Sequence, residues 1–82
     1  MKILLFAQAR KLLSRDALDW EIETPQSVNS LWDWLQAEYP ALLPLRASSR
    51  IACNESYLQD QSGEGILQPE DVVAIIPPVS GG

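Results

Sequence analysis

Histidine is absent from this chain of 82 residues, and cysteine occurs once, at Cys53. A zinc site needs about four Cys, His or acidic ligands in a suitable arrangement, and no such set is evident. Neither a Ser-His nor a Cys-His pair can form, and a single cysteine excludes a disulfide within the chain. A phosphate-binding loop of the G-x-x-x-x-G-K-[ST] type is also missing. We therefore expect no self-sufficient enzyme, and no cofactor or metal bound by the chain itself.

Long hydrophobic runs are missing as well. The longest apolar stretches have four or five residues, such as 3–7, whereas a membrane helix needs about 20. The opening residues do not form a secretory signal. Six Lys and Arg face eleven Asp and Glu, a net charge of -5, and this balance is unfavourable for a nucleic-acid binder. We expect a cytoplasmic protein whose partners include neither nucleic acid nor a membrane.

The composition is that of a small globular domain, with 46% apolar and 21% charged residues. Residues 2–7 are apolar between polar neighbours, which predicts a buried strand. A short helical turn is expected over 8–14. Residues 18–23 alternate apolar and acidic side chains, the period of a half-buried strand.

One substantial helix is expected over 28–39. Ser27 can cap its first turn, and the apolar residues that follow recur at the spacing of one helix face. Pro40 ends the segment, because the residue before a proline avoids the helical conformation. Trp34 lies off the apolar stripe, and we expect it at the edge of the domain.

The second half of the chain predicts further strands after a patternless connection over 41–49. One helix covers only one face of a sheet, so we expect a two-layer α+β domain over 1–76 and an extended tail over 77–82. The expected segments are short strands at 50–54 and 57–58, a polar loop at 59–68 and a strong strand at 72–76.

A single helix leaves one sheet face uncovered. The first and last strands are apolar on both faces, so the uncovered face should carry an apolar patch, which usually marks a partner surface. The alternative is that one of the connections, 41–49 or 59–68, folds over this face.

The tail has a distinctive composition. Pro77 and Pro78 lack N–H donors and fix φ, so they end the strand. Gly81 and Gly82 have no Cβ and fit a channel too narrow for other residues. The terminal carboxylate is ionised at neutral pH and is a weak nucleophile, which another protein's active site could direct at the α-phosphate of ATP. A terminal Gly-Gly also arises by chance, so both interpretations stay open on composition alone.

Three segments resemble the small subunit of molybdopterin synthase, the MoaD-type sulfur carriers of the ubiquitin-like ThiS/MoaD family. They are the ending VVAIIPPVSGG, the opening KILLFAQARKLL and the middle segment RIACNESYL. The resemblance extends over nearly the entire chain and implies the β-grasp fold, a mixed sheet with one main helix. The sequence departs from the family at 68–71, where such proteins often have a Gly-Asp turn.

The same resemblance implies a role for the tail. Gly82 would be adenylated by an E1-like activating enzyme that uses ATP in trans, and then converted to a thiocarboxylate, with Gly81 as a slender neck. The tail would enter the large subunit of a heterotetrameric molybdopterin synthase. There it would donate sulfur to cyclic pyranopterin monophosphate in molybdenum cofactor biosynthesis.

Interface candidates follow from the apolar alternation and the tail. They are Phe6, Val73, Ile75, Pro77, Pro78 and Val79, together with Leu4, or else the residues on the opposite faces of the same strands.

Two other features have a plain structural interpretation. The basic cluster of Arg10, Lys11 and Arg15 predicts a solvated face, with docking of the adenylating enzyme as the alternative. Cys53 lies in an expected strand and is predicted to be buried and inert.

The acceptor of the tail chemistry is open on the residues alone. Close rivals are sulfur transfer in thiamine or cysteine synthesis and a ubiquitin-like modifier joined to lysines. A protein-interaction module with a passive tail belongs to a different class.

Overall fold

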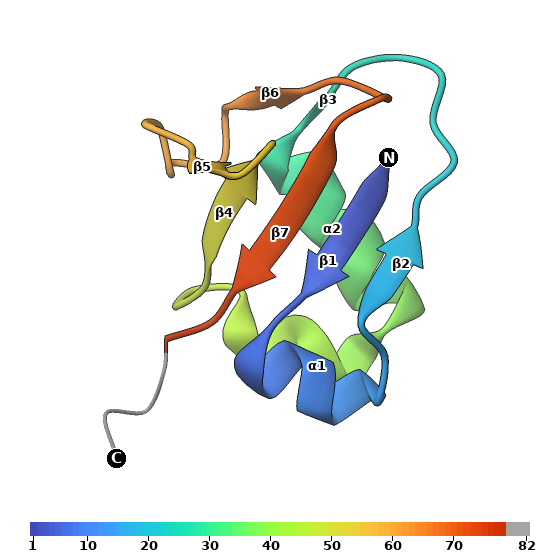
Figure 1. Cartoon of the computed structure of the whole chain (residues 1–82), viewed down its shortest axis with the longest axis vertical. Coiled ribbons are helices and arrows are strands. Elements are labelled where there is room, and N and C mark those ends of the chain that lie inside the picture. The colour runs from blue at the N-terminus through green and yellow to red at the C-terminus, as the bar shows by residue number, and fades with distance from the viewer. Residues whose placement is uncertain (79–82) are drawn as a thin grey trace.

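The last strand lies at the centre of a mixed sheet in the computed structural model, which describes residues 1–78 (Figure 1). Strand β7 (Val72–Ile76) runs parallel to β1 (Lys2–Leu5) on one side and antiparallel to β4 (Arg50–Cys53) on the other. The outer strands are β2 (Ala17–Asp19) next to β1, and β5 (Ser56–Tyr57) next to β4.

Helix α2 (Val28–Glu38) covers one face of this sheet (Figure 1). Its start is the predicted one: the Ser27 hydroxyl oxygen accepts a hydrogen bond from the Ser30 N–H at 3.1 Å. The helix ends before Pro40, with Tyr39 as its C-cap. The predicted two-layer α+β arrangement with one main helix is therefore confirmed.

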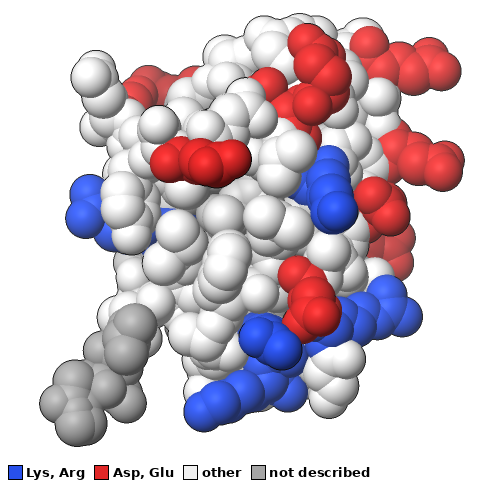
Figure 2. All heavy atoms as spheres, viewed as in Figure 1, with Lys and Arg blue, Asp and Glu red and all other residues white. Residues whose placement is uncertain are grey.

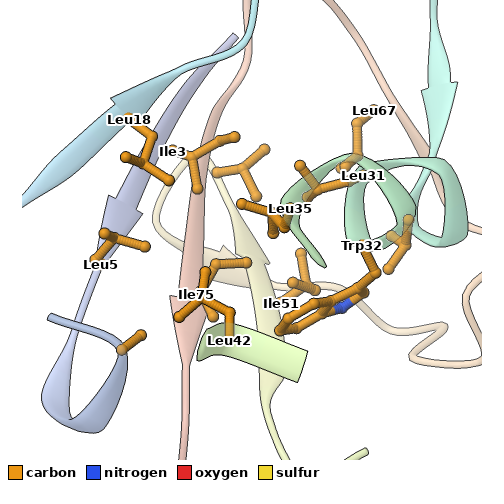
Figure 3. Close-up of a cluster of buried hydrophobic side chains, with 13 residues drawn as sticks. Ile3, Leu5, Leu18, Leu31, Trp32, Leu35, Leu42, Ile51, Leu67 and Ile75 are labelled. Carbon is orange, nitrogen blue, oxygen red and sulfur yellow. The ribbon is translucent and has the colours of Figure 1, made fainter. Parts of the chain in front are cut away.

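The core fills the space between α2 and the sheet (Figure 3). Residues at helical spacing on α2 meet alternate residues of β1, β4 and β7, so each element contributes one apolar face. The largest fully buried side chains of these four elements are Leu31, Leu35, Ile3, Ile51, Val73 and Ile75.

The parallel pairing of β1 and β7 determines what lies at one edge of the sheet. Leu5 of β1 is level with Ile75 of β7, so both strands end at the same edge. Strand β1 continues there into helix α1 (Ala7–Leu13), and β7 continues into Pro77. Helix α1 confirms the helical turn expected over 8–14, and the register places it beside the root of the tail.

Strand β2 is shorter than predicted. The alternation over 18–23 indicates a strand up to residue 23, whereas β2 ends at Asp19. Asp19 is paired with Lys2, the first residue of β1, and beyond this pair Trp20 and Met1 still exchange backbone hydrogen bonds of 2.9 and 2.8 Å. The Trp20 ring stacks on Trp34, with ring centroids 5.2 Å apart. This contact confirms the expectation that Trp34 folds onto the edge of the domain.

Two features have no counterpart in the expected elements. The 3₁₀ helix η1 (Pro40–Leu45) occupies part of the connection over 41–49 and buries Leu42. Strands β3 (Gln26–Ser27) and β6 (Ile66–Leu67) form a small antiparallel pair, which buries Leu67. Two-residue strands and a single 3₁₀ segment are too short to show a periodic pattern, so tertiary contacts decide them.

None of the helices within residues 1–78 has the length and apolar character needed to span a bilayer. Strand β7 ends at Ile76, and the division between a domain over 1–76 and a tail over 77–82 stays a prediction.

Candidate functional site

The sheet face opposite α2 carries a shallow apolar groove of about 220 Å³, which we call the sheet groove. Neither the 41–49 connection nor the 59–68 loop contributes to its lining, so the prediction of an uncovered apolar face is confirmed. Figure 2 views this face, and its centre is free of charged side chains. The lining residues are Leu4, Phe6, Ala52, Glu55, Tyr57, Val72, Ala74 and Ile76.

The groove exists because its floor is made of small residues. Ala52 of β4 and Ala74 of β7 are directly paired, and their methyl groups leave a hollow between larger neighbours. Tyr57 stands at one side on the edge strand β5 and is exposed. The guanidinium carbon of Arg50 lies 5.0 Å from the centroid of the Tyr57 ring, a cation–π contact that contributes about 0.5–1 kcal/mol at exposed sites.

The register corrects part of the expected interface. Leu4 pairs with Ala74 and shares its face, whereas Leu5 pairs with Ile75. Val73 and Ile75 therefore point toward α2 and are fully buried, so they are core residues and are wrong as interface candidates. Their strand is apolar on both faces, so the alternation alone could not assign either face to the helix.

The remaining candidates lie where the groove meets the tail. Phe6 is 45% exposed and lines the groove with Ile76, the last residue of β7. Pro77 is fully buried, which corrects its assignment to an accessible surface, while Pro78 is exposed. Pro77 instead anchors the tail root to the domain.

The other candidates, Val79, Gly81 and Gly82, lie outside the described residues. The groove also contains residues absent from the leading interface set: Tyr57, Val72 and Ile76, besides the two floor alanines. Alternate residues of β7 lie on opposite faces of the sheet. Once the pairing with β1 shows which face is open, this alternation identifies Val72, Ala74 and Ile76 as groove residues.

Cys53 is the last residue of β4, next to the groove residue Ala52, and it is partly buried where the sequence predicts a buried and inert cysteine. Burial raises the pKa of its thiol to about 11, and the hydrogen bond to Asp71 and the negative charge of that carboxylate add to the shift. A thiol with a raised pKa is a poor nucleophile at neutral pH.

Asp71 also organises the turn at 68–71. Its carboxylate accepts hydrogen bonds from the Gln68 N–H at 2.8 Å and from the Asn54 side-chain amide at 3.1 Å. These bonds, led by that from Gln68, lower the pKa of Asp71. The Asp71 N–H donates to the Gln68 carbonyl at 3.0 Å, so a turn forms here with Pro69 inside it.

Comparison with known proteins shows similarity over essentially the entire chain. The model of the ThiS family matches residues 3–82. The molybdopterin synthase sulfur carrier subunit of Arabidopsis thaliana is 37% identical over 82 residues, which cover all of this chain and 82% of that protein.

Solved structures agree in fold. Small archaeal modifier protein 1 from Methanosarcina acetivorans has a TM-score of 0.77 and 28% identity, covering 99% of this chain and 94% of that one. In the complex of subunits 1 and 2 of the molybdopterin-converting factor from Helicobacter pylori, one chain matches with a TM-score of 0.66 and 21% identity, covering 99% of this chain and 96% of that one. These similarities confirm the expected β-grasp fold.

Proposed function

The chain belongs to the ThiS family, and from this premise we propose that it is the sulfur-carrier small subunit of a molybdopterin synthase. The observation that carries the proposal is the 37% identity with the Arabidopsis thaliana carrier across all 82 residues. That match spans the chain from β1 to the last residue, so it is not confined to a single motif.

We propose that Gly82 carries the sulfur as the C-terminal residue. In an E1-like activating enzyme, a carboxylate oxygen of Gly82 would attack the α-phosphorus of ATP and release pyrophosphate, which leaves an acyl adenylate. Hydrosulfide, or a sulfur donor that delivers its equivalent, would then attack the carbonyl carbon and displace AMP. The product is a thiocarboxylate, and the ATP is bound by the enzyme and not by this chain.

The second half of the cycle would take place in the large subunit. The thiocarboxylate sulfur would attack a carbon of cyclic pyranopterin monophosphate that bears oxygen, and the C–O bond of that carbon would break as the C–S bond forms. Water would then hydrolyse the resulting thioester, which leaves the sulfur on the pterin and regenerates the Gly82 carboxylate. This chain has no histidine to act as a base near neutral pH, so proton transfers fall to the partner. The domain's own contribution is to hold the tail.

Residues 1–78 support a domain that holds the tail while the partner supplies the groups for proton transfer. The sheet groove offers an apolar contact surface next to the tail root, and buried Pro77 makes that root rigid. Phe6, Tyr57 and Ile76 would contact the large subunit while the tail occupies its active site.

The test of the carrier function is a reaction with an E1-like activating enzyme, ATP and a sulfur source. Mass spectrometry of the C-terminal fragment should locate a replacement of oxygen by sulfur at Gly82. Localisation is required because this change is nearly isobaric with oxidation of Met1 or Cys53. A variant with one residue added after Gly82 should remain unmodified. An unmodified wild-type chain, in a mixture where a known carrier reacts, would contradict the proposal.

One alternative acceptor has an observation in its favour. The 28% identity with a small archaeal modifier protein supports a ubiquitin-like modifier, whose activated glycine joins lysine amines. Incubating the thiocarboxylated chain with the large subunit and cyclic pyranopterin monophosphate should yield molybdopterin. Isopeptide adducts on lysines, with no molybdopterin formed, would favour the modifier function.

A further inference from the structure

The root of the tail has basic residues on both sides. On one side is α1, because β1 and β7 are parallel and end at the same edge of the sheet. On the other side is Arg50, which pairs with Ile76 in the antiparallel ladder of β4 and β7. We call Arg10, Lys11, Arg15 and Arg50 the basic rim; it holds four of the six Lys and Arg of the chain.

Most of this positive charge has no acidic partner. Arg10 pairs with Asp16 at 2.7 Å, and both side chains are largely exposed. Among residues 1–78, no carboxylate lies within salt-bridge distance of Lys11, Arg15 or Arg50. The guanidinium groups of Arg15 and Arg50 instead lie over the neutral rings of Tyr39 and Tyr57, at 6.0 and 5.0 Å from their centroids. Three net positive charges therefore face solvent around the tail root.

The opposite edge of the sheet is acidic. Asp19 is paired with Lys2 at the start of β1, and Asp71 precedes the start of β7. Glu55 lies in the turn between β4 and β5, beyond the pair of Cys53 with Val73. In Figure 2, Lys and Arg gather mainly below the open sheet face, around α1, while most Asp and Glu lie above and beside it.

This separation is notable in a chain whose net charge is -5. A uniformly acidic surface would repel an acidic partner from every side, whereas this molecule presents a cationic end where the tail begins. Charges separated in this way orient a protein during diffusional encounter, and such steering changes association rates by about 10–1,000-fold.

We propose that the basic rim docks on an acidic border around the channel of the large subunit that receives the tail, so that the carrier approaches tail first. The inference rests on the proposed function and adds the chemistry of the partner surface. The sheet groove then supplies the apolar contact, since Phe6 and Ile76 line it at the same edge.

The test is a stopped-flow measurement of association with the molybdopterin synthase large subunit from the same genome, at ionic strengths of about 20 and 300 mM, between which screening increases strongly. Lys11→Gln and Lys2→Gln remove the same charge from the same residue type at opposite edges of the sheet. We expect Lys11→Gln/Arg15→Gln to lower kon about tenfold at low salt, and Lys11→Gln alone about threefold, with koff nearly unchanged.

Lys2→Gln should lower kon less than Lys11→Gln does, because Lys2 starts β1 at the opposite edge of the sheet and the charges nearest the docking surface orient the encounter most. Lys11→Arg keeps the charge and should bind like the wild type. Thermal melts monitored by circular dichroism check folding. Glutamine is a good helix former at the exposed α1 position of Lys11, and Arg15 is exposed in the segment after the helix.

Equal changes in kon for the two lysine variants, or faster association after the rim is neutralised, would overturn this inference and leave the proposed function intact. A wild-type chain that does not bind the large subunit at either ionic strength would overturn the proposed function as well. A decrease in kon at low salt that occurs only in the rim variants, and that is smaller at 300 mM, supports an acidic border on the partner.

Discussion

Phe6 and Ile75 are large apolar side chains on neighbouring segments, and they have opposite environments. Ile75 is fully buried between the sheet and α2, while nearly half of Phe6 is open to solvent beside the sheet groove. Burial of an isoleucine side chain contributes about 1.5–3 kcal/mol to folding. Ile75 therefore stabilises the domain, and Phe6 leaves apolar area for a partner.

Ile75→Ala is expected to lower the free energy of unfolding by about 2–5 kcal/mol, because it leaves a cavity in the core. Phe6→Ala should cost less than about 1 kcal/mol, and Phe6→Asp should weaken binding to the large subunit while the domain stays folded. Urea denaturation followed by tryptophan fluorescence measures the free energies of unfolding, and titration calorimetry measures the affinity for the large subunit. Equal loss of stability in both alanine variants would contradict the assignment of the two faces.

Cys53 gives a pH-dependent prediction. Its pKa in the folded protein is about 11, against 9.0 for an ordinary thiol. Because the unfolded chain loses this proton first, the contribution of Cys53 to stability is complete below pH 9 and is lost as the pH rises through 11.

The rate of alkylation by iodoacetamide, measured against pH, should show a midpoint near 11 in the folded protein. Asp71→Asn should move this midpoint down, because it removes the negative charge next to the thiol. The chain has one cysteine, so the label reports on Cys53 alone. A midpoint near 9 in the folded wild type would contradict the role assigned to burial and Asp71.

At the scale of elements, the start of α2 is held by a local and a distant interaction. Ser27 caps the helix through its hydroxyl oxygen and also pairs with Ile66 in the small sheet of β3 and β6. The Val28 N–H donates to the Gly65 carbonyl at 2.9 Å. The helix that covers the sheet is thus positioned by the chain segment that precedes β7.

Ser27→Ala should lower the free energy of unfolding by about 1 kcal/mol, because the Ser30 N–H loses its acceptor. Ser27→Asn keeps a side-chain oxygen at the cap and should restore most of this loss. Ser48→Ala, at an exposed serine after η1, is the matched control and should change little. Chemical denaturation of the three variants measures the effect, and identical values for Ser27→Ala and Ser48→Ala would show that the cap is dispensable.

At the scale of the whole molecule, the two faces of one sheet divide folding from binding. The α2 face holds the core, and the open face holds a groove whose floor is the pair Ala52 and Ala74. The parallel strands β1 and β7 then bring one end of the groove, the basic rim and the root of the tail to one edge. A partner that contacts this edge engages all three together.

Ala74→Leu should fill the groove from its floor and raise the Kd for the large subunit at least about tenfold, because shape complementarity is lost at the centre of the contact. The larger side chain points away from the core, so the domain should stay folded. Ala47→Leu, at an exposed position outside the groove, is the control and should bind normally. Calorimetric titration measures both, and unchanged affinity of Ala74→Leu would place the partner elsewhere.

Local signals in the sequence predict much of this protein. The cap at Ser27, the stop at Pro40 and the apolar run over 72–76 are properties of neighbouring residues, so they identify α2 and β7 without any tertiary information. The family resemblance carried by the ending predicts both the β-grasp fold and the sulfur-carrier function. The chemistry proposed for the tail stays a prediction, and it rests on the resemblance of the ending to the family.

What the tertiary structure decided is non-local. Both faces of β7 are apolar, and only its pairing with β1 assigns Val73 and Ile75 to the core and Ala74 to the groove. The end of β2 at Asp19 depends on where β1 begins, and the basic rim forms because segments far apart in the chain meet at one edge. Register couples residues distant in sequence, and a shift of one position exchanges the two faces of a strand. Sequence periodicity therefore identifies the elements, while the pairing of strands determines which of their residues face a partner.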